Sequence, residues 1–375
     1  MSLRVLAIGM VDSIHFARWL DGLSDLDVSI FVFPSGPHRK LHANIVSILQ
    51  REDGKVRIPF GMALLSLPIW LLDKLLGDRL RGLLLRFYLQ KNKFDVIHFH
   101  EMQSGGYPLR FVPQRILDKS TVFYTPYGSD LFWFGEIPRH RVRIRKTLRI
   151  VNYIFPECDR DASLALAAGF KGDFGPRMAA GGPLQFPPMD QSKIAKRNKI
   201  AVKGYGGRWG RATTALRSLE QVQDALQGFE IHVISVTRDV QREILRLQKT
   251  STLKIVSHPK FSLSSFEVRQ LLLESKYYVA LSASDGFPAS LTEAALCGAI
   301  PIQSSTACLP ASLVEINPSG FLSEKSWAQV GEAIVAWELD PQRTKLLSLQ
   351  FSNWATDQQL SRVDFMGIMT EAYGL

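Results

Sequence analysis

The chain has 375 residues, enough for one large domain or two ordinary ones, and 46% hydrophobic against 21% charged residues indicate a folded globular protein. Its net charge is +10, and residues 1–190 contribute +7 of it, with 25 Lys and Arg against 18 Asp and Glu. A basic half favours an anionic partner, although a surface tuned for solubility has the same composition. The sequence contains no helix-turn-helix, zinc-finger or RNP-like motif, and no cysteine pair with CxxC spacing. Nucleic acid is therefore not an expected partner, and no zinc ribbon is expected.

The first half alternates between strand-like and helical patterns. "LRVLAIGM" predicts a buried strand, "SIHFARWLDGLSD" a helix and "DVSIFVFP" a second strand. Further strands are expected at "FDVIHFHE", "STVFYTPYG" and "NYIFPE". This alternation predicts a parallel sheet with helices on both faces. The N-terminus has no long apolar segment or cleavage site of a signal peptide, so we expect a cytoplasmic protein.

Two segments of this half combine apolar and basic residues. Residues 61–93 are mostly apolar with Arg and Lys spaced through them, and residues 139–149, "RHRVRIRKTLR", hold six basic residues and one His. Such stretches can lie on an anionic membrane surface, but two core helices of a large domain explain them as well. The uncharged run 60–72 is too short to cross a bilayer.

Residues 181–199 are rich in proline and show no periodicity, which predicts a linker. After it the alternation restarts with strands expected at "KIAVKGYG", "FEIHVISV", "LKIVSH", "YYVALSA" and "AIPIQS". The prediction is an α/β protein of two doubly wound, Rossmann-like domains, 1–185 and 195–355, with a helix at about 357–375 that can return to the first. Two such domains would face each other across a cleft, with functional loops at the carboxyl ends of the strands.

One of these loops, "KGYGGRWGRATT", is rich in glycine and lies between a strand and a helix. Glycines let the backbone approach a phosphate, and Arg208 and Arg211 add positive charge at the start of the helix. The loop has neither the Walker pattern nor a complete GxGxxG fingerprint. It therefore predicts a pyrophosphate site, with a flexible turn that carries two solvated arginines as the alternative.

A second loop, "SDGFPASLTEAALCGAIPIQSS", places Asp285 before a short helix and Glu293 inside it. Ser290 and Glu293 have the spacing of a capping box, so Glu293 could serve only the amides of its own helix. Asp285 could likewise be an ordinary turn residue before Gly286. The residues alone leave these structural explanations and a ligand site equally open.

The same stretch resembles the Glu-x7-Glu signature of family 4 glycosyltransferases, which are retaining enzymes with the GT-B fold. It has the form Asp285-x7-Glu293, with Gly286, Phe287, Ala294, Gly298 and Pro301 at the matching positions. "IHFARWLDGL", "DVIHFHEMQSGGYPL" and "VFYTPYGSDL" resemble further segments of that family in the same order. The resemblance covers nearly the whole chain and is most specific at 285–301.

The resemblance implies a role for each matching residue. Catalytic roles fall to Asp285, Arg208 and Arg211. Donor-binding roles fall to Glu293, Gly286, Phe287, Pro288, Gly207, Ser290 and Leu291. Acceptor or cleft positions in the N-terminal domain are Gly9, His15, His100, Tyr127 and Asp130. The second acid would hold the ribose hydroxyls, the first acid the donor sugar, and the arginines the diphosphate; no metal or other cofactor is required.

The resemblance therefore implies a hexosyl-transferring enzyme that uses a nucleotide-diphosphate sugar. The basic N-terminal half suggests a glycan or lipid-linked acceptor of cell-surface polysaccharide assembly, and a peripheral position on the inner face of the cytoplasmic membrane. The chain departs from the family pattern at Asp285, Pro288 and Tyr127. These departures motivate an alternative, a non-catalytic GT-B protein that serves as a binding or assembly partner. A sugar-nucleotide epimerase of the same fold is a third possibility, which the motif spacing disfavours.

Overall fold

The computed structural model describes residues 2–36, 41–59, 67–184, 196–207 and 209–375. The chain divides into two compact units, Met1–Gln185 with Leu360–Leu375 (unit 1) and Phe186–Gln359 (unit 2). Each unit has its own parallel sheet with helices, which confirms the expected α/β fold class.

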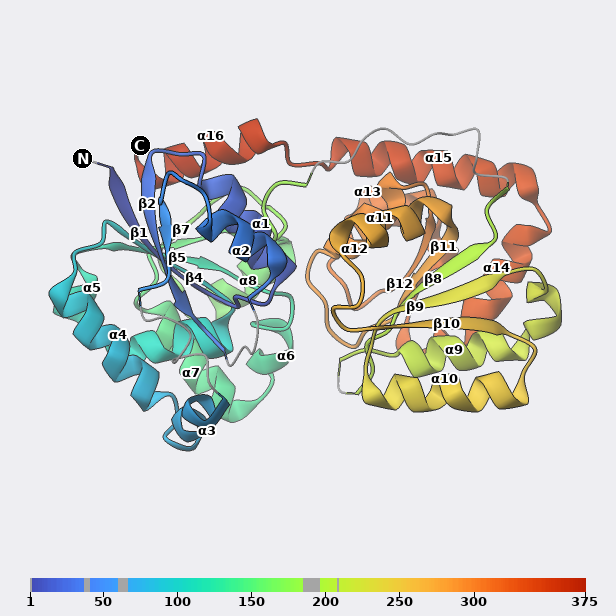
Figure 1. The fold of residues 1–375 in the computed structure, drawn as a ribbon, viewed down its shortest axis with the longest axis horizontal. Helices are drawn as coiled ribbons and strands as arrows, with labels where there is room; N and C mark the ends of the chain where they lie inside the picture. Colours follow the sequence, from blue (N-terminus) through green and yellow to red (C-terminus); the bar gives the residue numbers. More distant parts are fainter. Residues whose placement is uncertain (1, 37–40, 60–66, 185–195, 208) are drawn as a thin grey trace. The chain divides into compact units, whose positions relative to one another are not determined.

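Unit 1 is built on a seven-stranded parallel sheet with the order β3-β2-β1-β4-β5-β6-β7 (Figure 1). The strands are β1 (Leu3–Gly9), β2 (Val28–Pro34), β3 (Val56–Arg57), β4 (Val96–His100), β5 (Thr121–Thr125), β6 (Tyr153–Ile154) and β7 (Asp173–Phe174). The chain adds β2 and β3 on one side of β1 and the later strands on the other. The order therefore reverses between β1 and β4, which is where doubly wound sheets bind ligands.

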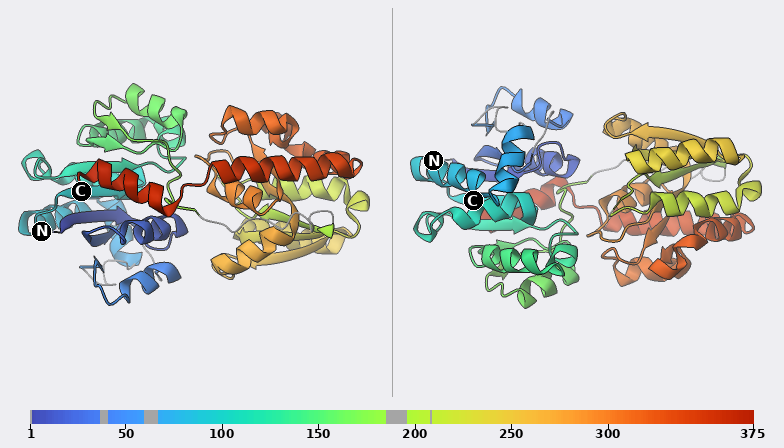
Figure 2. Two further views of the ribbon diagram at one scale, coloured as in Figure 1. Left: turned by 90° about the horizontal axis from the view of Figure 1, so that it is seen from above. Right: turned by 90° about the horizontal axis from the view of Figure 1, so that it is seen from below.

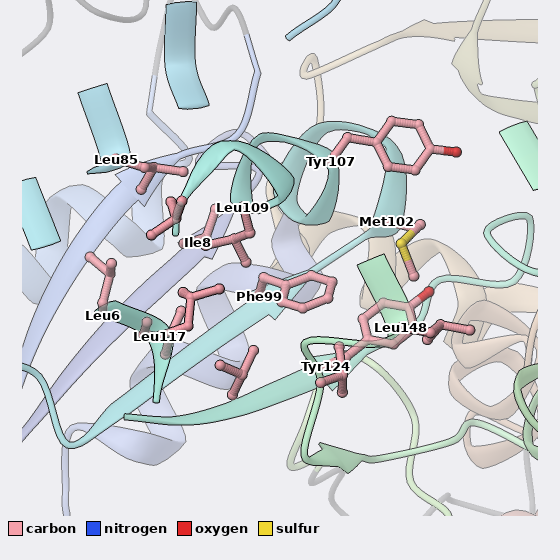
Figure 3. Packing of buried hydrophobic residues seen from close by; sticks show 14 of the residues in the cluster. Leu6, Ile8, Leu85, Phe99, Met102, Tyr107, Leu109, Leu117, Tyr124 and Leu148 are labelled. Carbon is pink, nitrogen blue, oxygen red and sulfur yellow. The ribbon is translucent and has the colours of Figure 1, made fainter. Parts of the chain in front are cut away.

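The helices of unit 1 cover both faces of this sheet (Figure 1). They are α1 (Ile14–Leu23), α2 (Ala43–Leu49), α3 (Leu67–Leu75), α4 (Arg79–Lys91), α5 (Gln114–Leu117), α6 (Phe132–Gly135), α7 (Pro138–Leu148), α8 (Asp159–Ala167) and α16 (Arg362–Tyr373), with a π-helical turn at Met102–Gly106 and a 3-10 turn at Tyr107–Phe111. Because side chains alternate along a strand, β1 feeds two cores. Val5 and Ala7 enter the first, whereas Leu6 and Ile8 enter the second, which Figure 3 shows with Phe99.

The C-terminal helix α16 belongs to the first core of unit 1. Phe365, Met369 and Tyr373 follow one another at intervals of four residues, so they share one helix face, and all three are buried. The hydroxyl group of Tyr373 lies 2.7 Å from Nδ1 of His98 on β4. In Figures 1 and 2 the red helix lies against the blue N-terminal elements, and α16 contacts α1.

Unit 2 is built on a six-stranded parallel sheet with the order β10-β9-β8-β11-β12-β13. The strands are β8 (Lys199–Lys203), β9 (Glu230–Val236), β10 (Lys254–Pro259), β11 (Ser275–Ala280), β12 (Ile300–Ser304) and β13 (Phe321–Leu322). This order reverses between β8 and β11. The loops that follow those two strands therefore meet at the reversal point, and they are the glycine-rich loop and the Asp285 loop.

The first five helices of unit 2 connect these parallel strands, and the last two follow β13. They are α9 (Ala212–Gln221), α10 (Arg238–Thr250), α11 (Ser265–Glu274), α12 (Ala289–Leu296), α13 (Ala311–Ile316), α14 (Val330–Glu338) and α15 (Pro341–Asp357), with 3-10 turns at Gln223–Leu226, Pro318–Gly320 and Glu324–Gln329. Among the residues that the structure describes in either unit, no helix combines the length and the apolar character that crossing a membrane requires.

Candidate active site

The two loops at the reversal point of unit 2 are joined by backbone hydrogen bonds. Gly210 and Ser282 form an antiparallel bridge. The Arg211 amide donates to the Leu281 carbonyl at 3.0 Å, and the Ala283 amide donates to the Trp209 carbonyl at 2.7 Å. The glycine-rich loop is therefore fixed against the strand end that leads to Asp285.

Glycine is required where this loop folds back on itself. A Cβ atom at Gly210 would lie 1.9 Å from the carbonyl oxygen of Tyr205, and one at Gly206 would lie 2.0 Å from a carboxylate oxygen of Asp239. Gly207 has φ +67°, a conformation that side chains other than glycine rarely adopt. These close approaches explain the number of glycines that the sequence places in the loop.

Two amides of the glycine-rich loop donate hydrogen bonds to side chains that follow strand β9. The Gly206 amide donates to Oγ1 of Thr237 at 3.1 Å, and the Gly207 amide donates to Asp239 at 2.7 Å. The Thr237 hydroxyl donates to the other oxygen of Asp239 at 2.6 Å. The bond from Thr237 and the Gly207 amide lower the pKa of Asp239, so the carboxylate is charged at neutral pH. Sequence reasoning did not find Thr237 or Asp239, which are more than 25 residues from the loop.

Asp285 lies beside a lysine that the sequence analysis did not single out. Lys203 is the last residue of β8, and its Nζ lies 2.9 Å from Oδ2 of Asp285. Both side chains are partly buried, with 21% and 23% exposed. Burial disfavours the ammonium form, but the Asp285 carboxylate outweighs it and raises the pKa of Lys203. The sequence does contain a signal that could have identified Lys203, because this lysine ends a buried strand directly before the glycine-rich loop.

Helix α12 begins at Ala289 and has Pro288 at its N-cap, without a side-chain hydrogen bond to the first turn. The capping box considered for Ser290 and Glu293 is therefore wrong. The helix starts before Ser290, so Glu293 falls in its second turn. Ser290 is instead a hydrogen-bond partner of Tyr278 on β11, and burial raises the pKa of that phenol to about 12.

The structure shows the surroundings of most of the other residues expected to bind the donor. Arg211 donates to the carbonyls of Gly207 and Gly210 at 3.1 and 3.0 Å, and its guanidinium lies 5.5 Å from the Trp327 ring centroid. Arg208 lies outside the described residues. Leu291 is fully buried, and the Gly286 carbonyl accepts from the Cys308 amide at 3.1 Å. The Phe287 ring is 6.3 Å from that of Trp354, and Pro288 accepts from the Leu291 amide at 2.8 Å.

In unit 1 the reversal point brings together three of the expected residues. The ring of Tyr127 lies 6.3 Å from that of His15 and 6.2 Å from that of His100. Gly9 ends β1, where a Cβ atom would meet the Phe16 ring at 2.5 Å. Asp130 is buried and accepts hydrogen bonds from the Met102 and Tyr127 amides and from the Tyr124 hydroxyl, each at 2.9 Å. Asp130 thus anchors the loop that carries Tyr127.

His100 gives unit 1 a testable pH dependence. The side chain is fully buried, neither ring nitrogen has a hydrogen-bond partner among the described residues, and burial lowers its pKa to about 3. Protonation therefore favours the unfolded chain, where the pKa is ordinary, and stability is lost as the pH falls below about 6.5. At pH 5 this histidine lowers the free energy of unfolding by about 2 kcal/mol relative to neutral pH.

We expect His100→Phe to abolish this pH-dependent loss of stability. The free energy of unfolding of the variant, measured relative to that of wild type, should therefore rise by about 2 kcal/mol from pH 7 to pH 5. Urea unfolding of both proteins at several pH values measures it. The comparison of the two proteins cancels the opposite contribution of Asp130, whose pKa burial raises. A stability difference that stays constant with pH would contradict a neutral, buried His100.

Comparisons with known proteins agree with this geometry. Residues 191–350 match the family model "Glycosyl transferases group 1". The structure resembles sucrose-phosphate synthase (tll1590) from Thermosynechococcus elongatus at TM-score 0.74 and 12% identity, over 99% of this chain and 98% of that one. It resembles Anabaena HepE (Alr3699), solved with UDP and glucose, at TM-score 0.66 and 13% identity, over 99% of both chains.

A solved UDP-N-acetylglucosamine 2-epimerase is also similar, at TM-score 0.58 and 11% identity, over 93% of this chain and 91% of that one. No curated protein sequence matches the chain. At these identities the solved structures establish the fold, and the match of residues 191–350 supplies the family of the second unit. The chain has the GT-B fold, and its residues 191–350, which make up most of unit 2, match the glycosyl transferases group 1 family.

Proposed function

We propose that the protein is a retaining family 4 glycosyltransferase that moves a sugar from a nucleotide-diphosphate sugar to an acceptor. The observation that carries this proposal is the junction of the glycine-rich loop with the Asp285 loop at the reversal point of the unit 2 sheet. Asp285, Lys203 and the start of α12 lie at this junction. HepE was solved with UDP and glucose, which makes UDP-glucose the first donor to test.

The proposed reaction needs leaving-group stabilisation and an oriented acceptor. Glu293 would bind the ribose hydroxyls through charge-assisted hydrogen bonds, and Asp285 would hold the donor sugar. Arg208 would neutralise charge that develops on the diphosphate as the bond to the anomeric carbon breaks. His15 and Tyr127 in unit 1 would contact the acceptor. The proposal requires no metal, because side chains supply the positive charge.

The test is a transfer assay with UDP-, GDP- and ADP-glucose, with product stereochemistry followed by NMR. We expect turnover with one donor class and a product that retains the configuration of the donor at the anomeric carbon. An inverted product would refute the retaining mechanism. A change at C2 of the sugar without transfer would show an epimerase instead.

One observation favours the second candidate, a non-catalytic GT-B protein that binds nucleotide sugars in a glycan pathway. The Gly206 and Gly207 amides are bonded to Thr237 and Asp239. A diphosphate that used the Gly207 amide would have to displace a charged carboxylate. Calorimetry separates the candidates, because the non-catalytic protein would bind a nucleotide sugar without consuming it over hours.

The acceptor side of the proposal rests on three helices of unit 1, which form the α3–α4–α7 face. Its exposed apolar side chains are Leu71, Leu72, Leu75, Leu76, Leu83, Phe87 and Val142. Its exposed basic side chains are Arg79, Lys91, Arg139, Arg141, Arg145 and Lys146. Residues 61–66 of the amphipathic segment lie outside the described residues. Exposed apolar side chains on helices that also carry exposed basic side chains suit an anionic membrane surface.

Ion pairs to one buried carboxylate hold this face together. Asp78, 1% exposed, lies in the turn between α3 and α4 and pairs with Lys74 at 2.8 Å and Arg81 at 3.2 Å. It also pairs with Arg143 of α7 at 3.4 Å. The three helices are thus linked through one carboxylate. We propose that the face docks on the inner side of the cytoplasmic membrane and that the acceptor is a lipid-linked precursor of a cell-surface glycan.

Replacing Leu75 and Phe87 together with Glu is expected to lower partition onto vesicles that contain phosphatidylglycerol at least tenfold. Leu75 is 85% exposed, and burying one such side chain contributes about 1.5–3 kcal/mol. Sedimentation with vesicles at two salt concentrations measures it. Leu339→Glu, which alters an equally exposed leucine of unit 2, is the matched control. Equal binding of both variants, or no binding of wild type, would refute the membrane surface.

A further inference from the structure

The Arg211 guanidinium and several amides of the glycine-rich loop are engaged by the protein itself. Within the described part of the glycine-rich loop, the amides of Gly204, Gly206, Gly207, Gly210 and Arg211 are all bonded to other groups of unit 2. The Arg211 guanidinium donates to two carbonyls of its own loop and stacks on Trp327. Arg211 therefore stabilises the loop, and further positive charge for the diphosphate could come from the neighbouring strand end.

Lys203 is placed to supply that charge. It ends β8 at the reversal point, between the glycine-rich loop that follows it and Asp285, whose Oδ2 lies 2.9 Å from Nζ. The ammonium also lies 5.5 Å from the ring centroid of Tyr205. An ammonium group has three N–H donors, so it can bind a second anion while it keeps Asp285. A strand end holds a cation more rigidly than a loop does.

We propose that Lys203, rather than Arg211, is a catalytic residue whose positive charge helps to stabilise the leaving diphosphate, with Asp285 holding its ammonium group in place. In the reaction the bond between the anomeric carbon and the phosphate oxygen breaks, and the electron pair stays on that oxygen. The acceptor oxygen forms the new bond, and its proton passes to the released diphosphate. Lys203 keeps its own protons throughout, so its contribution is electrostatic. This inference rests on the proposed transferase function.

The experiment compares Lys203→Met with Arg211→Met. Calorimetry measures the affinity for UDP and UMP (and for GDP with GMP and ADP with AMP), and the transfer assay measures kcat. We expect wild type to prefer the diphosphate over the monophosphate. Lys203→Met should lose this preference about tenfold or more, bind the monophosphate within about twofold of wild type, and lose kcat about 10²- to 10³-fold. Arg211→Met should keep the preference and unfold at a lower temperature.

Two further variants separate electrostatics from structure. Lys203→Arg should restore part of the diphosphate preference. In Lys203→Met combined with Asp285→Asn, no unpaired carboxylate remains to repel the ligand, so a diphosphate preference that returns in this double variant would overturn the proposal. Full preference and kcat in Lys203→Met, or loss of the preference in Arg211→Met, would also overturn it. If wild type bound no nucleoside diphosphate, the proposed function would fall as well, whereas an active wild type with an equally active Lys203→Met would refute this inference alone.

Discussion

Replacing Glu293 with alanine is expected to weaken nucleoside diphosphate binding about 10- to 100-fold and to change the stability of the unliganded protein by less than about 1 kcal/mol. Hydrogen bonds to a charged group contribute about 1.5–3 kcal/mol, and each 1.4 kcal/mol is tenfold in affinity. The small effect on stability follows from the start of α12. Its N-cap is Pro288, so Glu293 is not part of a capping box and the variant removes no such box.

Thermal unfolding with and without UDP, GDP or ADP measures both effects, because a ligand that binds only the folded state raises its stability. Glu332→Ala is the control, since this residue is an exposed glutamate of α14 in the same unit. A ligand-induced shift in Glu332→Ala and none in Glu293→Ala would assign Glu293 to the nucleotide. An unliganded protein that melts several degrees lower, with its ligand shift intact, would instead give Glu293 a structural role.

The architecture could be predicted from the sequence because it depends on local patterns. The apolar runs at 3–10 and 199–206 contain β1 and β8, and the alternation of strands and helices gave two parallel sheets. Short strands were less predictable. "NYIFPE" reads as a six-residue strand, but only Tyr153–Ile154 pair with neighbours. The paired length of β6 depends on its neighbours β5 and β7 rather than on the local pattern.

The contacts within the candidate site could not be predicted in the same way. Lys203 and Asp285 are 82 residues apart, and the Gly207 amide meets Asp239 across 32 residues. Both contacts follow from strand order, because β8 lies between β9 and β11. A linear sequence gives no such order. The motif spacing identified the loops, and the register of the sheet decided which side chains meet there.

The start of α12 shows how a local pattern can mislead. Ser290 and Glu293 have the spacing of a capping box, and the same spacing at Ser264 and Glu267 does form one at the start of α11. The difference lies in where each helix begins, since Ser264 is the N-cap of α11 and Pro288 is the N-cap of α12. Pro288 fixes its own φ and starts the helix at Ala289, so Ser290 is already inside the first turn. One proline therefore frees Glu293 from the capping role that the sequence left open.

Phe365→Ala is expected to destabilise unit 1 by about 3–5 kcal/mol, the usual cost of deleting a buried phenylalanine ring. Phe365 is fully buried in the first core, although it lies only ten residues before the last residue of the sequence. Its ring lies close to two glycines, since a Cβ atom would come within 2.8 Å of it at Gly22 and within 3.2 Å at Gly182. These glycines have no side chains that could fill the cavity.

Urea unfolding of Phe365→Ala and Val363→Ala measures this effect on one helix. Val363 is 77% exposed, so its truncation should change stability by less than about 0.5 kcal/mol. A nucleotide that binds unit 2 should raise the transition of that unit alone, which identifies the transition of unit 1. Loss of the unit 1 transition in Phe365→Ala would show that the last helix completes the core of the first domain. Equal stability of the two variants would mean that α16 contributes nothing to that core.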